Sequence, residues 1–181
     1  MERVHGRVAW GLAVLLVVAP GCGGDGGNDG DVPADGTSET TGLGRYEGGC
    51  EHMAEGPGQT VEAVAYGAVG APDVGAGHTR FDIDLAPVEG GKGGDVAYPA
   101  AEATDYVIAL DADVPLAILD GSGAEVAIEE TLRTGLPCTG VAVFHTVELD
   151  VGSYTLRLGP TPIARVSMVI EEAAGHVHEL E

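Results

Sequence analysis

Five of the six histidines in this 181-residue chain lie after residue 50, and imidazole is a common ligand of zinc, copper and nickel. The segment His176-Val177-His178 places two imidazoles on one face if it is extended, and Glu179 and Glu181 add carboxylates nearby. These residues indicate a divalent-metal site, with a solvated tail as the alternative. The candidate ligands are His52, His78, His176 and His178.

Paired aspartates could hold a harder cation. Asp82 and Asp84, and likewise Asp111 and Asp113, are two positions apart and share a face wherever the backbone is extended. Asp111 and Asp113 stand where a predicted strand meets a turn, and carboxylates in such places can form calcium sites together with loop carbonyls. They are therefore calcium candidates; the alternative is that both are solvated and Asp113 starts the turn before Pro115.

His145 differs from the other histidines because it alternates with apolar residues along a predicted strand. Val143 and Val147 flank it on the same face. We expect a hydrogen-bonded core histidine there rather than a metal ligand.

The N-terminus has the pattern of an export signal. Arg3 and Arg7 precede an uncharged apolar run from Val8 to Ala19, which is shorter than the roughly 20 residues of a membrane-spanning helix. The run ends in Val18-Ala19-Pro20-Gly21-Cys22, which resembles the lipobox of bacterial lipoproteins. The resemblance implies that residues 1–21 are a signal peptide and that Cys22 is acylated. An ordinary signal peptide cleaved nearby is the alternative.

Two cysteines remain once Cys22 is assigned to the lipid anchor. Cys50 and Cys138 form an even pair, and in the oxidising compartment that an exported chain reaches they predict a disulfide. The alternative is that Cys50 serves as a thiolate metal ligand within Cys50-Glu51-His52-Met53.

Charge restricts the choice of partners. With 8 Lys and Arg against 29 Asp and Glu, the formal net charge is -21 at pH 7. Such a chain repels phosphate backbones and anionic lipid headgroups, so nucleic-acid binding and adsorption to membranes through basic residues are disfavoured. Divalent cations or basic partners fit better; the alternative is that the charge only maintains solubility.

The strand pattern predicts an all-β protein after a flexible linker. Residues 22–49 are rich in Gly, Asp and Thr and predict a disordered tether that begins with the acylated cysteine. Residues 50–172 alternate short apolar strands with Gly, Pro and Asp turns, without the 3.6-residue period of a helical layer, and residues 173–181 form an acidic tail. We expect a jelly-roll-like antiparallel β-sandwich, with a half-buried strand over 141–149 that continues into a hairpin through Asp150–Ser153.

The individual strands can be placed from the same pattern. They are expected near Thr60–Tyr66, Thr79–Ala86, Asp95–Tyr98, Asp105–Leu110, Pro115–Leu119, Glu125–Ile128, Val141–Leu149, Tyr154–Leu158 and Ala164–Ile170.

Part of this series resembles a known family. The strand over Tyr106–Leu110, the segment Asp113–Gly123, and the sequence Gly152-x-Tyr154-Thr155-Leu156-x-Leu158 are similar to the β-sandwich of bacterial pre-peptidase C-terminal domains. The resemblance covers about Gly93 to Gly159, and it implies a jelly-roll-like accessory module of secreted enzymes.

No catalytic motif is complete. Asp120-Gly121-Ser122-Gly123 does not satisfy Gly-x-Ser-x-Gly, and it lies where a turn is needed. The adjacent Glu171 and Glu172 should point to opposite faces of a strand, so they do not form an acid/base pair. We therefore expect a non-catalytic lipoprotein at the outer membrane or cell surface, presenting a binding module to an envelope protein or glycan. The alternative is an envelope metal-binding protein that uses His52, His176 and His178.

Overall fold

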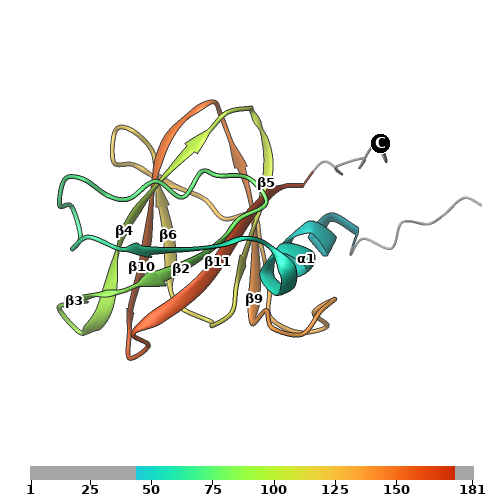
Figure 1. Cartoon of the computed structure of the whole chain (residues 1–181). Coiled ribbons are helices and arrows are strands. Elements are labelled where there is room, and N and C mark those ends of the chain that lie inside the picture. Colours follow the sequence, from blue (N-terminus) through green and yellow to red (C-terminus); the bar gives the residue numbers. More distant parts are fainter. Residues whose placement is uncertain (1–43, 174–181) are drawn as a thin grey trace, which may run out of the picture. The chain divides into compact units, whose positions relative to one another are not determined.

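The computed structural model describes residues 44–173, which form two β-sheets packed face to face, with a short helix outside them (Figure 1). The predicted all-β sandwich is confirmed: the sheets have the strand orders β1-β2-β11-β5-β9-β8 and β3-β4-β10-β6-β7. All strand pairs are antiparallel except β1 with β2. No helix among the described residues is long and apolar enough to cross a membrane.

The strands agree with the sequence pattern except at β3 and β8, which are extra. The six-stranded sheet contains β1 (Gly58–Glu62), β2 (Arg80–Asp84), β5 (Thr104–Leu110), β8 (Glu130–Leu132), β9 (Val143–Leu149) and β11 (Arg165–Glu172). The five-stranded sheet contains β3 (Ala86–Val88), β4 (Gly91–Ala100), β6 (Leu116–Leu119), β7 (Glu125–Val126) and β10 (Gly152–Thr161).

The main core lies between the two sheets and is built from alternate residues of each strand. In β2, Phe81 and Ile83 are buried there, while Asp82 and Asp84 face outward. In β10, Leu156 and Leu158 come from the opposite sheet into the same cluster. Each fully buried side chain of this size stabilises the fold by about 1.5–3 kcal/mol, so the alternating pattern determines which face of each sheet points inward.

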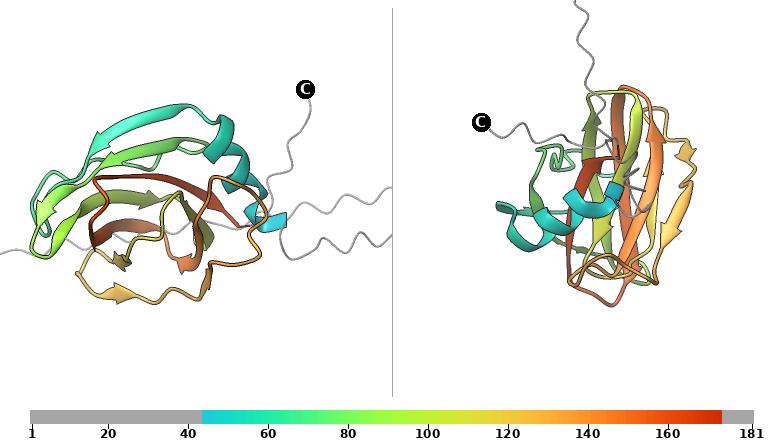
Figure 2. Two further views of the ribbon diagram at one scale, coloured as in Figure 1. Left: turned by 90° about the horizontal axis from the view of Figure 1, so that it is seen from below. Right: turned by 90° about the vertical axis from the view of Figure 1, so that its right-hand side faces the viewer.

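A helical layer covers the outer face of the six-stranded sheet, contrary to the sequence prediction. A 3-10 turn η1 (Gly44–Tyr46) leads into α1 (Glu47–Glu55), which packs against β5 and β11 (Figures 1 and 2). Tyr46 and Met53 are buried with Phe144 of β9 in a second cluster. The folded part therefore includes Gly44 to Gly49, which the sequence assigned to the tether; residues 22–43 lie outside the described residues.

Because of this layer, β9 is buried on both faces rather than half-buried. Phe144 is completely buried, and its ring centroid lies 4.8 Å from that of Tyr46. Thr146 on the same face is 3% exposed. The neighbouring β5 lies between β11 and β9, and its residues Tyr106–Leu110 are buried on both faces of the sheet.

The predicted disulfide between Cys50 and Cys138 is confirmed. It joins the middle of α1 to the loop between β8 and β9, with the two Cα atoms 5.8 Å apart. The thiolate-ligand alternative for Cys50 is therefore wrong. The bridge attaches α1 covalently to the sheet that it covers.

The predicted hairpin between β9 and β10 is wrong. β9 pairs with β5 and β8 in one sheet, whereas β10 pairs with β4 and β6 in the other. Both edges of each strand are thus occupied, and Asp150–Val151 carries the chain from one sheet to the other. The turn residues are the same in a hairpin and in such a crossing, so the local sequence does not distinguish them.

Candidate metal centre

Three side chains from distant parts of the chain meet beside α1: His52, His78 and Glu171. His52 Nε2 lies 2.9 Å from His78 Nδ1. The Glu171 carboxylate lies 3.7 Å from His52 Nε2 through Oε1, and 3.4 Å from His78 Nδ1 through Oε2. Within the range 44–173 this is the one group of three or more His, Cys, Asp or Glu donors close enough to share a metal ion.

His52 is positioned by the helix. It lies in the last turn of α1, and its carbonyl accepts a hydrogen bond of 3.0 Å from the Gly56 amide that ends the helix. Cys50 attaches this part of the helix to the rest of the fold through the disulfide, and Met53 does so through the second cluster, which it shares with Tyr46 and Phe144. The His52 side chain is 13% exposed, so it is held largely inside the protein.

His78 is positioned by an unusual backbone conformation. Its φ is 55°, and it is the one non-glycine residue with positive φ in the part of the chain described. This left-handed region is disfavoured for most side chains, although histidine, asparagine and aspartate enter it more often than others. The conformation turns the chain just before β2 begins at Arg80, and the imidazole faces His52. Backbone strain of this kind persists when surrounding contacts fix it, and it is concentrated at functional sites.

Glu171 is positioned by the sheet. It lies near the end of β11, and its side chain points to the outer face, on which the buried Val169 also lies. The side chain is 5% exposed and packs beside Gly48 of α1, where a Cβ would lie 3.4 Å from Glu171 Cγ. A buried carboxylate needs a positive or hydrogen-bonding neighbour to offset its lost hydration, and a metal ion is one such neighbour.

The donors lie close enough together to share one metal ion. Zinc lies 2.0–2.1 Å from nitrogen and oxygen ligands, so the ligands of a tetrahedral ion lie about 3.3 Å apart. The separations of 2.9, 3.4 and 3.7 Å are measured to different oxygens of Glu171; with one donor atom from each residue, all three atoms lie within 4.8 Å of one another. Two imidazoles and one carboxylate also leave a fourth position open for another ligand.

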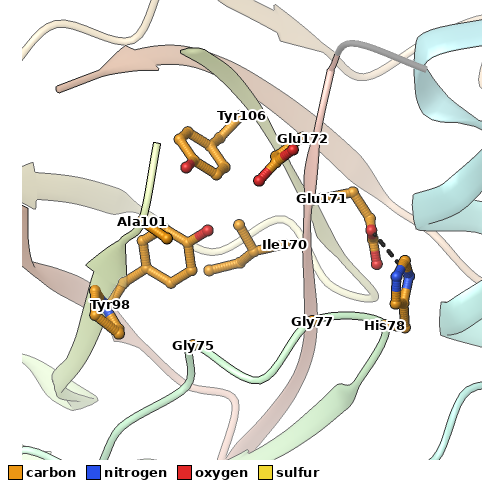
Figure 3. Close-up of a pocket in the computed structure, with 10 residues that line it drawn as sticks. Gly75, Gly77, His78, Tyr98, Ala101, Tyr106, Ile170, Glu171 and Glu172 are labelled. Carbon is orange, nitrogen blue, oxygen red and sulfur yellow. Dashed lines mark ion pairs between the residues drawn. The ribbon is translucent and has the colours of Figure 1, made fainter. Parts of the chain in front are cut away.

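The sequence identified two of the three donors. His52 and His78 were among the predicted ligands, and the structure brings them together; His176 and His178 lie outside the described residues, so their participation stays a prediction. Glu171 was missed as a ligand. Its orientation was nevertheless foreseen, because Glu171 and Glu172 do point to opposite faces of β11 (Figure 3).

The structure does not bring the other polar candidates into such a group. Asp113 accepts a hydrogen bond of 2.8 Å from Arg133, and the pKa of the Asp113 carboxyl is lowered by that bond. Asp111 accepts one from the Ser167 amide at 2.8 Å. Among residues 44–173 neither belongs to a cluster of three metal donors, so the calcium site stays a prediction without structural support.

His145 and Asp120, for which the sequence predicted structural roles, have those roles in the structure. His145 is 3% exposed, and its Nδ1 lies 2.9 Å from Thr131 Oγ1, as expected for a hydrogen-bonded core histidine. The Asp120 carboxylate accepts hydrogen bonds from the Ser122 amide and hydroxyl and from the Ala124 amide, which is a turn function.

A pocket of about 230 Å³ adjoins the three donors. His78 and Glu171 form one part of its wall, and Tyr98, Tyr106 and Ile170 form another (Figure 3). Figure 3 shows Glu171 reaching toward His78 on one side of β11, while Ile170 and Tyr106 lie on the other side. The pocket is therefore lined from both faces of β11, near the end of that strand.

No known protein-family model matches the chain, and no curated protein is similar to it in sequence. The resemblances to lipoprotein signals and to pre-peptidase C-terminal domains therefore stay predictions. The function has to be inferred from the site itself.

Proposed function

We propose that this protein binds a divalent transition metal, zinc foremost, through His52, His78 and Glu171. The observation that carries the proposal is the convergence of two imidazole nitrogens and a buried carboxylate at separations of 2.9 to 3.7 Å. The set shares His52 with the predicted combination of His52, His176 and His178, whose two tail histidines lie outside the described residues.

The donor chemistry favours zinc, copper or nickel over calcium and magnesium. Imidazole suits the first group, whereas calcium and magnesium take oxygen ligands almost entirely. Three protein ligands are fewer than the four of a closed structural zinc site. The His78 side chain is 45% exposed, so solvent or another ligand has access to the ion.

The proposed setting is the bacterial cell envelope. The lipobox-like sequence before Cys22 supports a lipid anchor at the outer membrane or cell surface, and the Cys50–Cys138 disulfide supports an oxidising compartment. Within this setting the protein is a non-catalytic module that presents a bound metal to an envelope protein or glycan.

Zinc titration of the purified mature chain by calorimetry tests the proposal. We expect one tight site, weakened at least about tenfold in His78→Asn and in Glu171→Gln, because even the outer partners of metal ligands contribute that much. Asparagine tolerates the left-handed backbone at position 78, and glutamine preserves the shape of Glu171, so both variants should fold.

The control is the double variant His176→Asn/His178→Asn, which removes both imidazoles of the tail. It separates a site at His52, His78 and Glu171 from zinc captured by the tail alone. If the His78→Asn protein binds zinc as tightly as the parent, or if the parent binds none, the proposed site is wrong.

A further inference from the structure

The pocket next to the metal site has one wall that could recognise an extended peptide. β11 pairs with β2 only over Arg165–Met168, so its last residues have β5 as their one strand partner within the described chain. The Ala173 amide donates to Asp105 and the Ser167 carbonyl accepts from Asp111, so the odd-numbered residues direct their backbone groups toward β5.

The alternate residues, Ile170 and Glu172, therefore direct their N–H and C=O groups toward the other edge, because successive residues of a strand face opposite edges. That edge borders the pocket, whose wall includes Gly75 and Gly77 across from it. Gly75 sits so close to the Pro99 ring that a Cβ would lie 2.5 Å from it. Backbone groups on an unpaired edge are the usual means by which a sheet captures an extended peptide.

The pocket is small, and it has an aromatic wall beside the carboxylates of Glu171 and Glu172. Tyr98 and Tyr106 meet edge to face with ring centroids 5.5 Å apart, and Ile170 lies beside them. Burial, the largest cause, raises the pKa of Tyr98, which keeps this wall neutral. A space of about 230 Å³ lies below the usual 300–1,000 Å³ of small-molecule sites. It therefore fits a ligand about the size of one amino-acid residue.

We propose that this pocket binds the C-terminal residue of a peptide, with its carboxylate on the open coordination position of the metal and its apolar or aromatic side chain against Tyr98 and Tyr106. The inference rests on the proposed metal site, which has a fourth position and two of whose ligands, His78 and Glu171, line the pocket. The edge of β11 that has no strand partner among residues 44–173 favours a peptide over a free amino acid, because a peptide also supplies backbone groups to that edge.

Binding should require the metal. Glu171 and Glu172 both line the pocket, and with a net charge of -21 the metal-free protein repels a carboxylate. The divalent ion offsets the charge of these two carboxylates and supplies the bond to the ligand. A C-terminal amide should bind poorly, because it lacks the negative charge.

N-acetyl-L-phenylalanine is the probe, titrated into the zinc-loaded and the zinc-free mature chain by calorimetry. We expect binding only with zinc, and at least about tenfold weaker binding of N-acetyl-L-phenylalaninamide and of N-acetylglycine, because one lacks the charged group and the other the apolar side chain. Free L-phenylalanine should also bind more weakly than the acetylated form.

A pocket-filling variant, Ala101→Trp, provides a second measurement. Ala101 is exposed at the pocket wall, so the indole should block the probe without disturbing the core, while zinc affinity changes less than about threefold. Val69→Trp is the matched control, since Val69 is 96% exposed and lies outside the pocket lining.

The outcomes separate the two proposals. Zinc binding without any probe binding overturns the peptide inference and leaves the metal site intact. Equal binding with and without zinc overturns the role of the metal, and free phenylalanine binding as well as the probe overturns the choice of a peptide. If zinc itself does not bind, both proposals are wrong.

Discussion

His52 Nε2 and His78 Nδ1 lie 2.9 Å apart although 26 residues separate them in the chain. At this distance one ring nitrogen donates a hydrogen bond to the other. Neither nitrogen then has its lone pair available to a metal ion. To ligate a metal through that nitrogen, the donating ring must change tautomer and carry its proton on the other nitrogen, because imidazole ligates in its neutral form with the donor nitrogen bare.

Zinc binding should weaken when the pH is lowered from about 7.5 to about 5.5, because protons compete with the metal for the imidazole nitrogens, and an imidazole that is protonated before binding should release its proton. Calorimetry in two buffers of different ionisation enthalpy measures the release directly. An affinity that is constant over this range would contradict ligation by this histidine pair.

The buried His145 should make the fold less stable in acid. Burial and then the charge of Arg133 lower the pKa of this imidazole, against a smaller opposing effect of Asp113. The unfolded chain, with an ordinary histidine pKa of about 6.5, then takes up a proton before the folded chain does. The free energy of unfolding should be unaffected above about pH 6.5 and should fall as pH drops from there toward the lowered folded pKa.

Denaturant unfolding of the parent and of His145→Leu across this pH range isolates the effect. The leucine variant should lose this part of the pH dependence, whereas Thr131→Val, which removes only the hydrogen bond to Nδ1, should retain it. Parallel curves for the parent and His145→Leu would contradict the prediction.

Arg157 and Asp95 form the ion pair whose loss should destabilise the fold most. They face each other across β10 and β4, joined by two hydrogen bonds of 2.9 Å. Burial alone would raise the pKa of Asp95, but the bonds from Arg157 and the Gly67 amide outweigh it and lower the pKa. Arg157→Met should cost about 3–5 kcal/mol, because Asp95, which is 2% exposed, would be left as a buried charge without its cation.

Arg165→Met is the matched control. Arg165 also makes two hydrogen bonds to an aspartate, Asp84, but these side chains are 54% and 40% exposed. Its loss should cost no more than about 1 kcal/mol. Equal effects of the two substitutions on the free energy of unfolding, measured by denaturant titration, would refute the distinction between these two pairs.

The disulfide should stabilise the outer layer as well as the whole fold. Its two cysteines are 88 residues apart, and in the chain-entropy account a loop of this length contributes up to about 4–5 kcal/mol. Cys50→Ser/Cys138→Ser should lower the midpoint of denaturation and weaken zinc binding, because His52 lies two residues after Cys50 on the same helix. Unchanged zinc affinity in the double variant would show that apolar packing alone positions α1.

Cys22 should anchor the protein to a membrane. Cys22→Ala removes the residue that the lipobox-like sequence marks for acylation, so the protein should leave the membrane fraction. The Cys50→Ser/Cys138→Ser variant serves as a control and should stay membrane-bound. Sedimentation of Cys22→Ala with membranes in the same proportion as the parent would refute the anchor.

Most of the strands could be predicted from the period-two alternation of apolar residues, because this alternation shows which face of a strand is buried. It could not reveal α1, whose sequence Glu47–Glu55 contains two glycines and no apolar stripe; the helix depends on the burial of Met53 and on the bond from Cys50. It also could not tell that β9 and β10 belong to different sheets, because alternation reports which face is buried and not which strand is the partner.

Only two of the three donors of the site could be identified from the sequence, for a related reason. Histidines are rare enough to draw notice, so His52 and His78 were identified by residue type. Glu171 is one of 29 acidic residues, and only the register of β11 against β5 and the position of α1 distinguish it. The left-handed conformation of His78 has no sequence signal, because histidine adopts it only where neighbouring contacts require it.

The position of the disulfide along the chain divides the molecule unequally. The covalent ring from Cys50 to Cys138 encloses β1 to β8, whereas β9, β10 and β11 follow it. A protease that cut at Val151, which is 67% exposed between β9 and β10, would leave β10 and β11 held by noncovalent contacts alone. His52 and His78 lie inside the ring and Glu171 lies on the strand beyond the cut, so a bound metal ion would retain the severed fragment.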